Sequence, residues 1–314
     1  MALRRLRLAT RGSPLALAQV DIVAAALART TAGEVLVERV IVETRPDRSL
    51  TVPIHRLGGR GLFVSEVEQA VSSGRADAAV HSAKDVPSSP ELSQVHIAAV
   101  LARDDPRDCL VGLPLSALPA GARVATGSIR RRAQLAWLRP DLSFGELRGN
   151  IGTRLSKLPS SGAIVTAVAA MRRLGLEEDI AEVLSTAEML PQVGQGTIVV
   201  SCRADDPAAC SLLREVDDER SRIELAAERA FLAAAGGGCD LPIGAYARVL
   251  SECGAGTPER LRLEAMVASH DGHVVVRASS SGPVDDSAAD YLGRKMAQEV
   301  LERRGGADLL GWDQ

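Results

Sequence analysis

Aromatic residues are scarce in this sequence, which has two Trp, two Tyr and three Phe among 314 residues. Proteins that bind single-stranded nucleic acids stack the bases on aromatic side chains, so we expect no nucleic acid partner. The five cysteines include no Cys-x-x-Cys pair and no companion histidine at a metal-ligand spacing. This pattern argues against a disulfide framework and against a metal site, so any cysteine that matters is expected to act as a thiol.

Long apolar runs are also missing. The longest, such as AIVTAVAAM at 163–171, fall well short of the roughly 20 residues that a membrane-spanning helix needs. Residues 1–12 alternate Leu with Arg and never form the apolar core of a secretory signal. These absences predict a cytoplasmic protein without a membrane partner.

The size and composition are those of a folded protein with more than one domain. Hydrophobic residues make up 46% and charged residues 25% of a 33.0 kDa chain, which excludes disorder. A chain of this length exceeds the size at which one core keeps growing. We therefore expect two or three domains.

Short apolar runs repeatedly end in a turn that opens an amphipathic stretch, a pattern typical of βα units over a parallel sheet. Such junctions occur at residues 10–14, 82–87, 126–131, 148–150 and 171–173. Pro14 suits the first turn of a helix, and the apolar positions of that helix are Leu17, Val20, Val23 and Leu27. In open α/β sheets the ligand lies beyond the carboxyl ends of the strands, where these junctions converge.

Basic residues are concentrated near these junctions, with eight basic against two acidic residues over 123–157. Such a run is also ordinary for a solvated helix face. Helix N-termini favour anions, however, and a guanidinium group holds a carboxylate through two parallel hydrogen bonds. The pattern predicts a polyanionic ligand held between α/β lobes.

The character of the sequence changes after about residue 215. A helical stretch at 222–235 precedes the break GGGCDLP at 236–242, and alternating runs at 261–268 and 273–279 flank a predicted hairpin turn at Asp271-Gly272. A last helix is expected to begin near Asp285 or Asp286 and to end at Gly305-Gly306. Its buried positions are predicted to be Tyr291, Leu292, Met296 and Val300. This part predicts a small α+β domain.

Seven sequence blocks together carry a family resemblance. They are ATRGSPLALAQ at 9–19, GGRGLF at 58–63, ADAAVHSAKDVP at 76–87, SIRRRAQL at 128–135, LRGNIGTRLSKL at 147–158, VGQG at 193–196 and GGCDLPIGAYA at 237–247. In these blocks and their order the chain resembles the hydroxymethylbilane synthase (porphobilinogen deaminase) family over nearly its whole length.

The resemblance implies an α/β fold with two lobes like those of periplasmic binding proteins and a small C-terminal α+β domain. The family's chain crosses twice between the lobes, which places lobe one at 1–99 and 197–215, lobe two at 103–191 and the third domain at 219–314. The implied enzyme is a monomeric transferase of tetrapyrrole biosynthesis. It condenses four porphobilinogen molecules on a dipyrromethane cofactor, with loss of ammonia, and releases hydroxymethylbilane.

The resemblance also assigns site residues. Asp85 matches the catalytic aspartate, which stabilises the cationic azafulvene left when ammonia departs, and Cys239 matches the cysteine that carries the cofactor by a thioether. The positions that match cofactor and substrate contacts are Arg11, Ser13, Lys84, Arg130, Arg131, Arg148, Arg154 and Arg173. Thr126, Ser128 and Gln195 lie within matching blocks and are expected to contact the cofactor.

Blander interpretations exist for several of these residues. Without the family match, Asp85 is an ordinary turn residue before a proline, and Cys239 is one more small buried hydrophobe. His81 is expected to be packed rather than catalytic. Arg132 and Arg172 match no family position and are expected to be solvated.

The sequence departs from the family pattern at residues 44–47, 125–128 and 166–171, and Arg60 replaces a lysine. These departures leave open a paralogue that binds polycarboxylate pyrroles without turnover, or a related enzyme with an altered product. Residues 46–60 have no clear periodicity and are long for a connection. We expect them to form a lid over the arginine-lined site.

Overall fold

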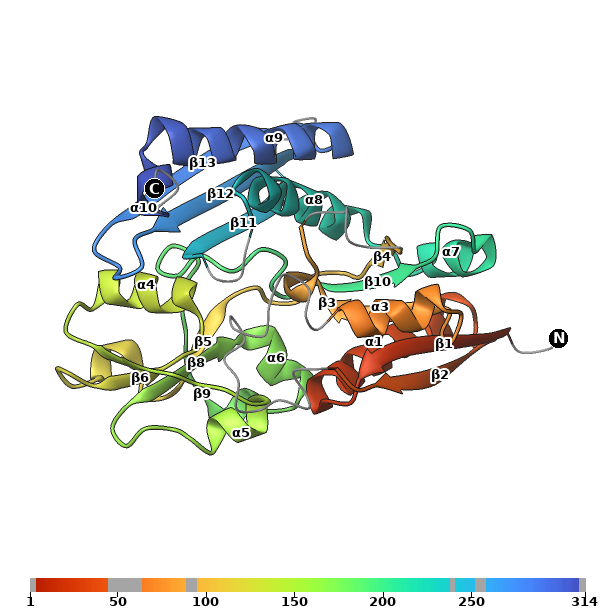
Figure 1. The fold of residues 1–314 in the computed structure, drawn as a ribbon, viewed down its shortest axis with the longest axis horizontal. Helices are drawn as coiled ribbons and strands as arrows, with labels where there is room; N and C mark the ends of the chain where they lie inside the picture. The colour runs from red at the N-terminus through yellow and green to blue at the C-terminus, as the bar shows by residue number, and fades with distance from the viewer. Residues whose placement is uncertain (1–3, 45–63, 89–94, 238–240, 252–257, 311–314) are drawn as a thin grey trace. The chain divides into compact units, whose positions relative to one another are not determined.

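The computed structural model of the chain describes residues 4–44, 64–88, 95–237, 241–251 and 258–310. They form two five-stranded sheets and one three-stranded sheet, with helices packed on them (Figure 1). The chain divides into two compact units. One is Met1–Asp104 with Thr197–Arg222, and the other is Asp105–Gly196 with Ile223–Gln314. The predicted α/β class is confirmed.

The first unit is built on a sheet with the strand order β2-β1-β3-β10-β4. Its strands are β1 (Arg4–Arg11), β2 (Val35–Val42), β3 (Ala78–Ser82), β4 (His96–Val100) and β10 (Ile198–Cys202). Its helices are α1 (Pro14–Thr30), α3 (Ser65–Ser72) and α7 (Pro207–Arg214), and a 3₁₀ turn η2 (Ala83–Asp85) follows β3.

Helix α1 begins where the sequence predicts. The hydroxyl of Ser13 accepts a hydrogen bond from the Ala16 N–H, and Pro14 occupies the first turn, where its missing N–H has no cost. Val20, Val23 and Leu27 are buried in the core of this unit, while Leu17 is half-buried. The 3.6-residue period of these positions turns one face of α1 toward the sheet.

The second unit contains a sheet with the order β7-β6-β8-β5-β9. The strands are β5 (Asp108–Gly112), β6 (Arg123–Ala125), β7 (Ser143–Gly145), β8 (Ala163–Ala167) and β9 (Ile180–Val183). The helices are α4 (Ile129–Leu138), α5 (Ile151–Leu155) and α6 (Val168–Arg173), with 3₁₀ turns η4 (Leu115–Ala117) and η5 (Glu177–Asp179). Helices α4 and α5 begin at the predicted junctions 126–131 and 148–150, whereas α6 begins before the predicted junction at 171–173, and these three residues form its last turn.

The two large sheets are mixed rather than parallel. Strand β10 runs antiparallel to β3 and β4, and β5 runs antiparallel to β8 and β9. Both strands come directly after the chain crosses from one unit to the other. Parallel pairing needs a crossover connection, usually a helix, and no such helix precedes either strand. They therefore enter their sheets from the end where the parallel strands finish, and the prediction of βα units over a parallel sheet does not hold for these two strands.

The third sheet has the order β11-β12-β13 and lies within the second unit. Its strands are β11 (Ile243–Leu250), β12 (Arg260–Ala268) and β13 (Val275–Gly282). The associated helices are α8 (Glu219–Ala234), α9 (Asp286–Gln298) and α10 (Gly306–Leu309), and the π-helical segment η6 (Glu299–Arg303) continues α9. The predicted hairpin and the predicted Asp285 cap are both present.

One predicted core residue of the last helix is wrong. Leu292, Met296 and Val300 are buried against the third sheet, but Tyr291 is 66% exposed. Its ring lies beside the Lys295 ammonium group, 6.0 Å from the ring centroid, on the solvent side of α9. No helix among the described residues is long and apolar enough to cross a membrane.

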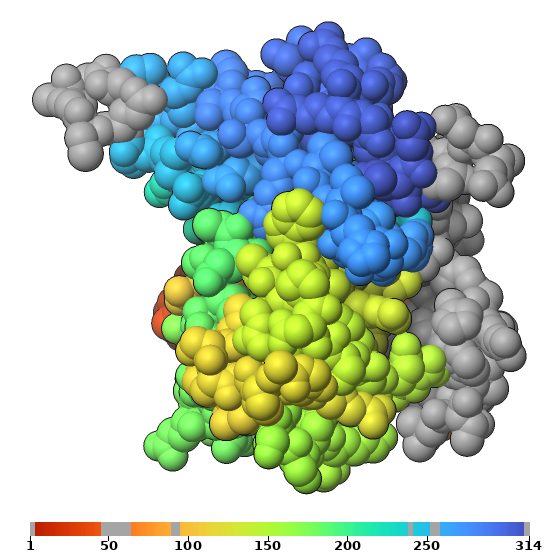
Figure 2. All heavy atoms as spheres, turned by 90° about the vertical axis from the view of Figure 1, so that its left-hand side faces the viewer, coloured from red at the N-terminus to blue at the C-terminus, as the bar shows by residue number. Residues whose placement is uncertain are grey.

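Helix α4 connects the second sheet to the third. Ala133 of α4 packs with Leu190, Met266 and Ala268 in one small core cluster. A Cβ atom on Gly272, at the β12–β13 turn, would lie 2.4 Å from the Ala133 carbonyl oxygen, so only glycine permits this approach. Figure 2 shows the blue C-terminal segment seated directly on the yellow-green segment that contains α4.

Two buried glutamates of α8 hold backbone groups of other segments. Glu228 is fully buried, and its carboxylate accepts hydrogen bonds from the N–H groups of Gly194, at 2.7 Å, and Ala247, at 2.8 Å. Glu224 accepts one from Val249 at 2.9 Å. Helix α8 thus fixes both strand β11 and the loop that contains Gln195.

We expect Glu228→Gln to destabilise the chain by about 2–4 kcal/mol. A glutamine has one carbonyl oxygen and cannot accept hydrogen bonds at both positions, so its NH₂ group would face a backbone N–H. Urea unfolding of the variant and of Glu219→Gln measures this difference. Glu219 lies on the same helix with an 81% exposed side chain, so its replacement is the matched control, and equal midpoints for the two variants would contradict the assigned role.

Candidate functional site

Predicted site residues of the first unit gather at one edge of its sheet. Strands β1 and β3 are parallel neighbours, so their carboxyl ends lie at the same edge. Arg11 ends β1 and is followed by Ser13, while Lys84 and Asp85 follow β3 in η2. The structure therefore brings together these four residues, which are far apart in the sequence.

The segment that carries Asp85 is fixed from the side of α1. Gln19 is buried, and its side-chain amide donates a hydrogen bond of 2.6 Å to the Ser82 hydroxyl, directly before η2. The Asp85 side chain itself is exposed and makes no ion pair with any residue that the structure describes. Its carboxylate is therefore accessible to a ligand at this edge.

The second unit presents an equivalent edge. Strands β7, β6 and β8 are mutually parallel, and predicted site residues follow the carboxyl end of each. After β6 come Thr126 and Ser128, then Arg130 and Arg131 in the first turn of α4. After β7 come Arg148 and, in α5, Arg154, and Arg173 ends α6 after β8.

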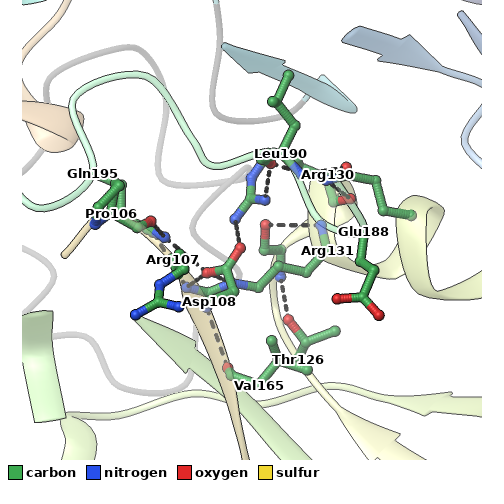
Figure 3. Close-up of polar contacts among 12 residues, drawn as sticks. Pro106, Arg107, Asp108, Thr126, Arg130, Arg131, Val165, Glu188, Leu190 and Gln195 are labelled. Atoms are coloured by element: carbon green, nitrogen blue, oxygen red, sulfur yellow. Dashed lines mark hydrogen bonds and ion pairs between the residues drawn. The ribbon is translucent and has the colours of Figure 1, made fainter. Parts of the chain in front are cut away.

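A buried carboxylate, Asp108, organises the centre of this edge (Figure 3). It is the first residue of β5 and pairs with Ala167 at the carboxyl end of β8, because β5 runs antiparallel. Its Oδ2 is 2.8 Å from a terminal nitrogen of Arg130, and its Oδ1 accepts hydrogen bonds from Arg131, at 2.8 and 3.0 Å, and from Gln195, at 2.9 Å.

These charges are nearly removed from water, since Asp108 is 0% exposed, Arg130 3% and Arg131 7%. Burial alone opposes the charged form of Asp108. The positive charges of Arg130 and Arg131 and the hydrogen bond from Gln195 outweigh it and lower the pKa of Asp108 to about 2. Asp108 is therefore a carboxylate at neutral pH. Burial lowers the pKa of Arg130, and the negative charge of Asp108 opposes that shift.

The two guanidinium groups are held but not neutralised. Arg130 also donates to the Leu190 carbonyl and Arg131 to the Val165 carbonyl, so both planes are fixed. Two cations face one carboxylate, and Arg130 Nε finds no hydrogen-bond partner among the described residues. A surplus positive charge in a buried site is costly unless an anion approaches, and this donor set therefore fits carboxylate groups of a ligand.

Two of the other cations of this edge are anchored by backbone oxygens. Arg154 Nε donates to the Gly149 carbonyl at 2.8 Å, and an Arg173 terminal nitrogen donates to the Gly196 carbonyl at 2.5 Å. Arg148 lies 4.0 Å from the Glu146 carboxylate. All three side chains remain partly exposed, unlike Arg130 and Arg131.

Hydroxyl groups shape the start of α4. The Ser128 hydroxyl accepts a hydrogen bond from the Arg131 N–H, and the Thr126 hydroxyl accepts one from the Ser128 N–H. A Cβ atom on Gly127 would lie 2.8 Å from the Leu147 carbonyl oxygen. Within the departure from the family pattern at 125–128, glycine at position 127 therefore has a structural reason, because a side chain there would clash with the segment after β7.

Residues expected to lie outside the site behave as predicted in part. His81 is buried, as expected, and burial lowers its pKa to about 4. Arg132 is exposed above the Phe144 ring. Arg172 is also exposed, but it additionally lies 3.6 Å from the Asp105 carboxylate, so it is not simply solvated. Cys239 and the predicted lid at 46–60 lie outside the described residues.

Two family models match the chain. The one described as porphobilinogen deaminase, dipyromethane cofactor binding domain, matches residues 6–211, and the one described as porphobilinogen deaminase, C-terminal domain, matches residues 222–302. The chain belongs to the porphobilinogen deaminase family. Membership confirms the predicted transferase class and dipyrromethane cofactor, and it does not favour the alternative of a binding protein without turnover.

Relatives named porphobilinogen deaminase match along nearly the entire chain. The protein of Roseiflexus sp. (strain RS-1) is 45% identical over 96% of this chain and 97% of its own length. That of Roseiflexus castenholzii is 45% identical over 98% and 99%. The protein of Acidothermus cellulolyticus is 43% identical over 98% and 92%.

Similarity to solved structures is weaker. A TRAP periplasmic solute binding protein from Desulfovibrio salexigens is 12% identical with a TM-score of 0.41, over 70% of this chain and 74% of that one. One from Roseobacter denitrificans is 15% identical with a TM-score of 0.35, over 69% and 79%.

Three residues that support the site were missed in the sequence. Asp108, Gln19 and Glu228 each hold a residue or loop of the predicted set, and each is buried. The one available signal was the excess of basic residues over 123–157. If some of these residues are buried, an acidic residue from another part of the chain is expected to pair with them. Nothing in the local pattern of RDDPRDCLV at 103–111 identifies Asp108 as that acid.

Proposed function

We propose that this member of the porphobilinogen deaminase family is a hydroxymethylbilane synthase whose cofactor is attached to Cys239 and whose catalytic carboxylate is Asp85. It joins four porphobilinogen molecules in turn, releases one ammonia for each and frees the linear tetrapyrrole hydroxymethylbilane. The observation that carries the site assignment is the buried cluster of Arg130, Arg131 and Asp108, because two cations share one carboxylate there and the remaining positive charge favours an anionic ligand.

Each edge has its own groups that can hold carboxylates. Each pyrrole ring carries an acetate and a propionate, so a chain of rings is a polyanion. In the second unit, Arg148, Arg154 and Arg173 hold carboxylates through their partly exposed guanidinium groups. Arg130 and Arg131 complete this set with the guanidinium N–H groups that do not donate to Asp108. In the first unit, Arg11 and Lys84 supply further positive charge beside the N-terminus of α1.

Smaller groups orient the ligand. Thr126 and Ser128 hold the first turn of α4 in place, which aims its N–H groups at an anion. Ser13 does the same for α1. Gln195 bridges Asp108 and Arg131. It keeps the guanidinium plane of Arg131 fixed while ligand carboxylates bind and leave. Pre-organised donors of this kind need no rearrangement as charge develops.

Asp85 acts on the reacting pyrrole of the substrate. Departure of ammonia leaves positive charge on that ring, and a carboxylate placed beside the ring nitrogen stabilises the charge and assists proton transfer. The dipyrromethane, when bound, supplies the free α-carbon to which the first substrate is joined. The exposure of Asp85, without an ion-pair partner among the described residues, leaves its charge available for this role.

The proposal includes three domains, with lobe one at 1–99 and 197–215, lobe two at 103–191 and the third domain at 219–314. It also includes a monomer that acts in the cytoplasm and binds no nucleic acid. The described cysteines Cys109, Cys202 and Cys210 are free thiols, which is consistent with a reducing compartment.

The intact mass of the purified chain tests the attachment. We expect the wild-type mass to exceed the polypeptide mass by two deaminated porphobilinogen units. Cys239→Ser should fold but lack the surplus, whereas Cys253→Ser, the control thiol, should keep it. The wild-type chain should also convert porphobilinogen to hydroxymethylbilane. An unmodified wild-type chain from cells that make porphobilinogen would refute the proposal.

A further inference from the structure

A second group of reactive side chains lies in the first unit, away from the residues discussed above. The thiols of Cys202 and Cys210 and the imidazole of His96 place their ligand atoms within 4.8 Å of one another. We propose that they form a binding site for a thiophilic divalent cation such as Zn²⁺, with two thiolate ligands, one imidazole ligand and an exchangeable fourth position.

The backbone brings two of these residues together. Cys202 ends β10 and His96 begins β4, and the two are directly paired in the antiparallel ladder. Directly opposite residues project from the same face of a sheet, with Cβ atoms about 5 Å apart. Helix α7 then supplies Cys210, whose sulfur lies 3.4 Å from the Cys202 sulfur and 3.9 Å from His96 Nε2.

These separations suit a small soft cation. Zn²⁺ binds sulfur at about 2.3 Å and nitrogen at about 2.0–2.1 Å, so neighbouring ligand atoms of a tetrahedral site are about 3.5–4 Å apart. The two measured separations lie close to this range. Thiolate with imidazole is also the donor set that selects Zn²⁺ over Mg²⁺ or Ca²⁺, which take oxygen ligands.

Room for a fourth ligand is present beside the cluster. A pocket of about 280 Å³ is lined by His96, Ala204, Pro207, Cys210 and Arg214. Of the two carboxylates close in sequence, Asp205 is 87% exposed and lies 3.6 Å from Arg203, and Asp206 already accepts hydrogen bonds from Arg203 and from the Ala209 N–H. Water from the pocket therefore completes the coordination, and the open position lets a chelator remove the cation.

The site lies at the opposite end of the strands from Asp85. Cys202 pairs with Ala78 at the start of β3, whereas Ser82, directly before η2, pairs with Ile198. Four residues of strand separate these positions by about 13 Å. The cation would link β4, β10 and α7, so we expect it to stabilise the fold and to leave turnover unchanged.

The sequence gives no sign of this site. The two cysteines are eight residues apart, and His96 precedes Cys202 by more than 100 residues, which matches no metal-ligand spacing. The prediction of no metal site followed from spacing alone, and only the pairing of β4 with β10 brings the three residues together.

Metal titration of the primer-loaded, reduced protein tests the proposal. We expect one equivalent of Zn²⁺ or Co²⁺ per chain, thiolate-to-cobalt charge-transfer absorption and a higher melting temperature that a chelator reverses. Cys210→Ser and His96→Ala should each weaken binding by more than about 100-fold, because even residues that only orient ligands change affinity about 10–100-fold. Both positions are at least partly exposed, so both variants should fold.

Two control variants separate this site from other ligands. His270→Ala removes another exposed imidazole, and Cys253→Ser removes a thiol outside the cluster. Both should bind like the wild type, and turnover should be equal in all variants. The proposal is overturned if cobalt absorption persists in Cys210→Ser, if the reduced wild type binds no equivalent, or if Cys202 and Cys210 form a disulfide instead of binding cobalt.

Discussion

Asp85→Asn is expected to fold, to keep its cofactor and to lose turnover by about 100- to 1,000-fold, the usual effect of removing one charge-stabilising group. The amide preserves the shape of the side chain but cannot stabilise positive charge on the pyrrole. Because Asp85 is exposed in η2, the substitution should change the melting temperature little.

The measurement combines the intact mass with single-turnover kinetics, so that cofactor loading and rate are separated. Asp21→Asn is the matched control, since Asp21 is an exposed aspartate of the same unit that pairs with Arg39 on the outer strand β2. A primer-loaded Asp85→Asn with near-normal turnover would exclude the carboxylate from the reaction.

The second large effect is expected at Asp108. Asp108→Asn should destabilise the chain by about 3–5 kcal/mol, because it leaves Arg130 and Arg131 buried without their counter-charge. Urea unfolding measures the loss. Asp141→Asn is the control, since Asp141 also has its pKa lowered to about 2, first by a hydrogen bond from Arg139, but it is exposed. Its replacement should change stability little.

The same carboxylate predicts a pH dependence. The pKa of Asp108 is about 2 in the folded chain and 3.8 in the unfolded reference, so its stabilisation is complete above about pH 4. It is lost as the pH falls toward 2, by about 2–3 kcal/mol in all. The wild type should show this acid loss and Asp108→Asn should not. Parallel stability curves for the two proteins would contradict the assignment.

Local signals predicted the elements that depend on neighbours in sequence. Ser13-Pro14 predicted the start of α1, and Asp271-Gly272 predicted the β12–β13 hairpin, because caps and turns depend on a few adjacent residues. Tyr291 was predicted to be buried but is exposed. The helical period identifies which face of the helix packs on the sheet, but it does not show how wide the buried part of that face is.

Long-range pairing could not be predicted in the same way. The direction of β5 and β10 depends on where the chain re-enters each unit. The direction of β5 determines the position of Asp108, and the direction of β10 brings Cys202 beside His96, where Cys210 completes the cluster. Family resemblance supplied the site residues that contact ligands. It did not supply Asp108 or Gln19, whose roles depend on partners at least 22 residues away in the sequence.

The position of β10 constrains how the chain folds while it is being synthesised. Strand β4 is at the edge of the first sheet, and β10 separates it from β3, yet about 100 residues must be added after β4 before β10 leaves the ribosome. This interval is roughly 5 to 20 s at ordinary synthesis rates. All five strands of the second sheet lie between Asp108 and Val183 and emerge within it. The second sheet can therefore assemble first, while β4 of the nascent first unit still lacks its pairing strand.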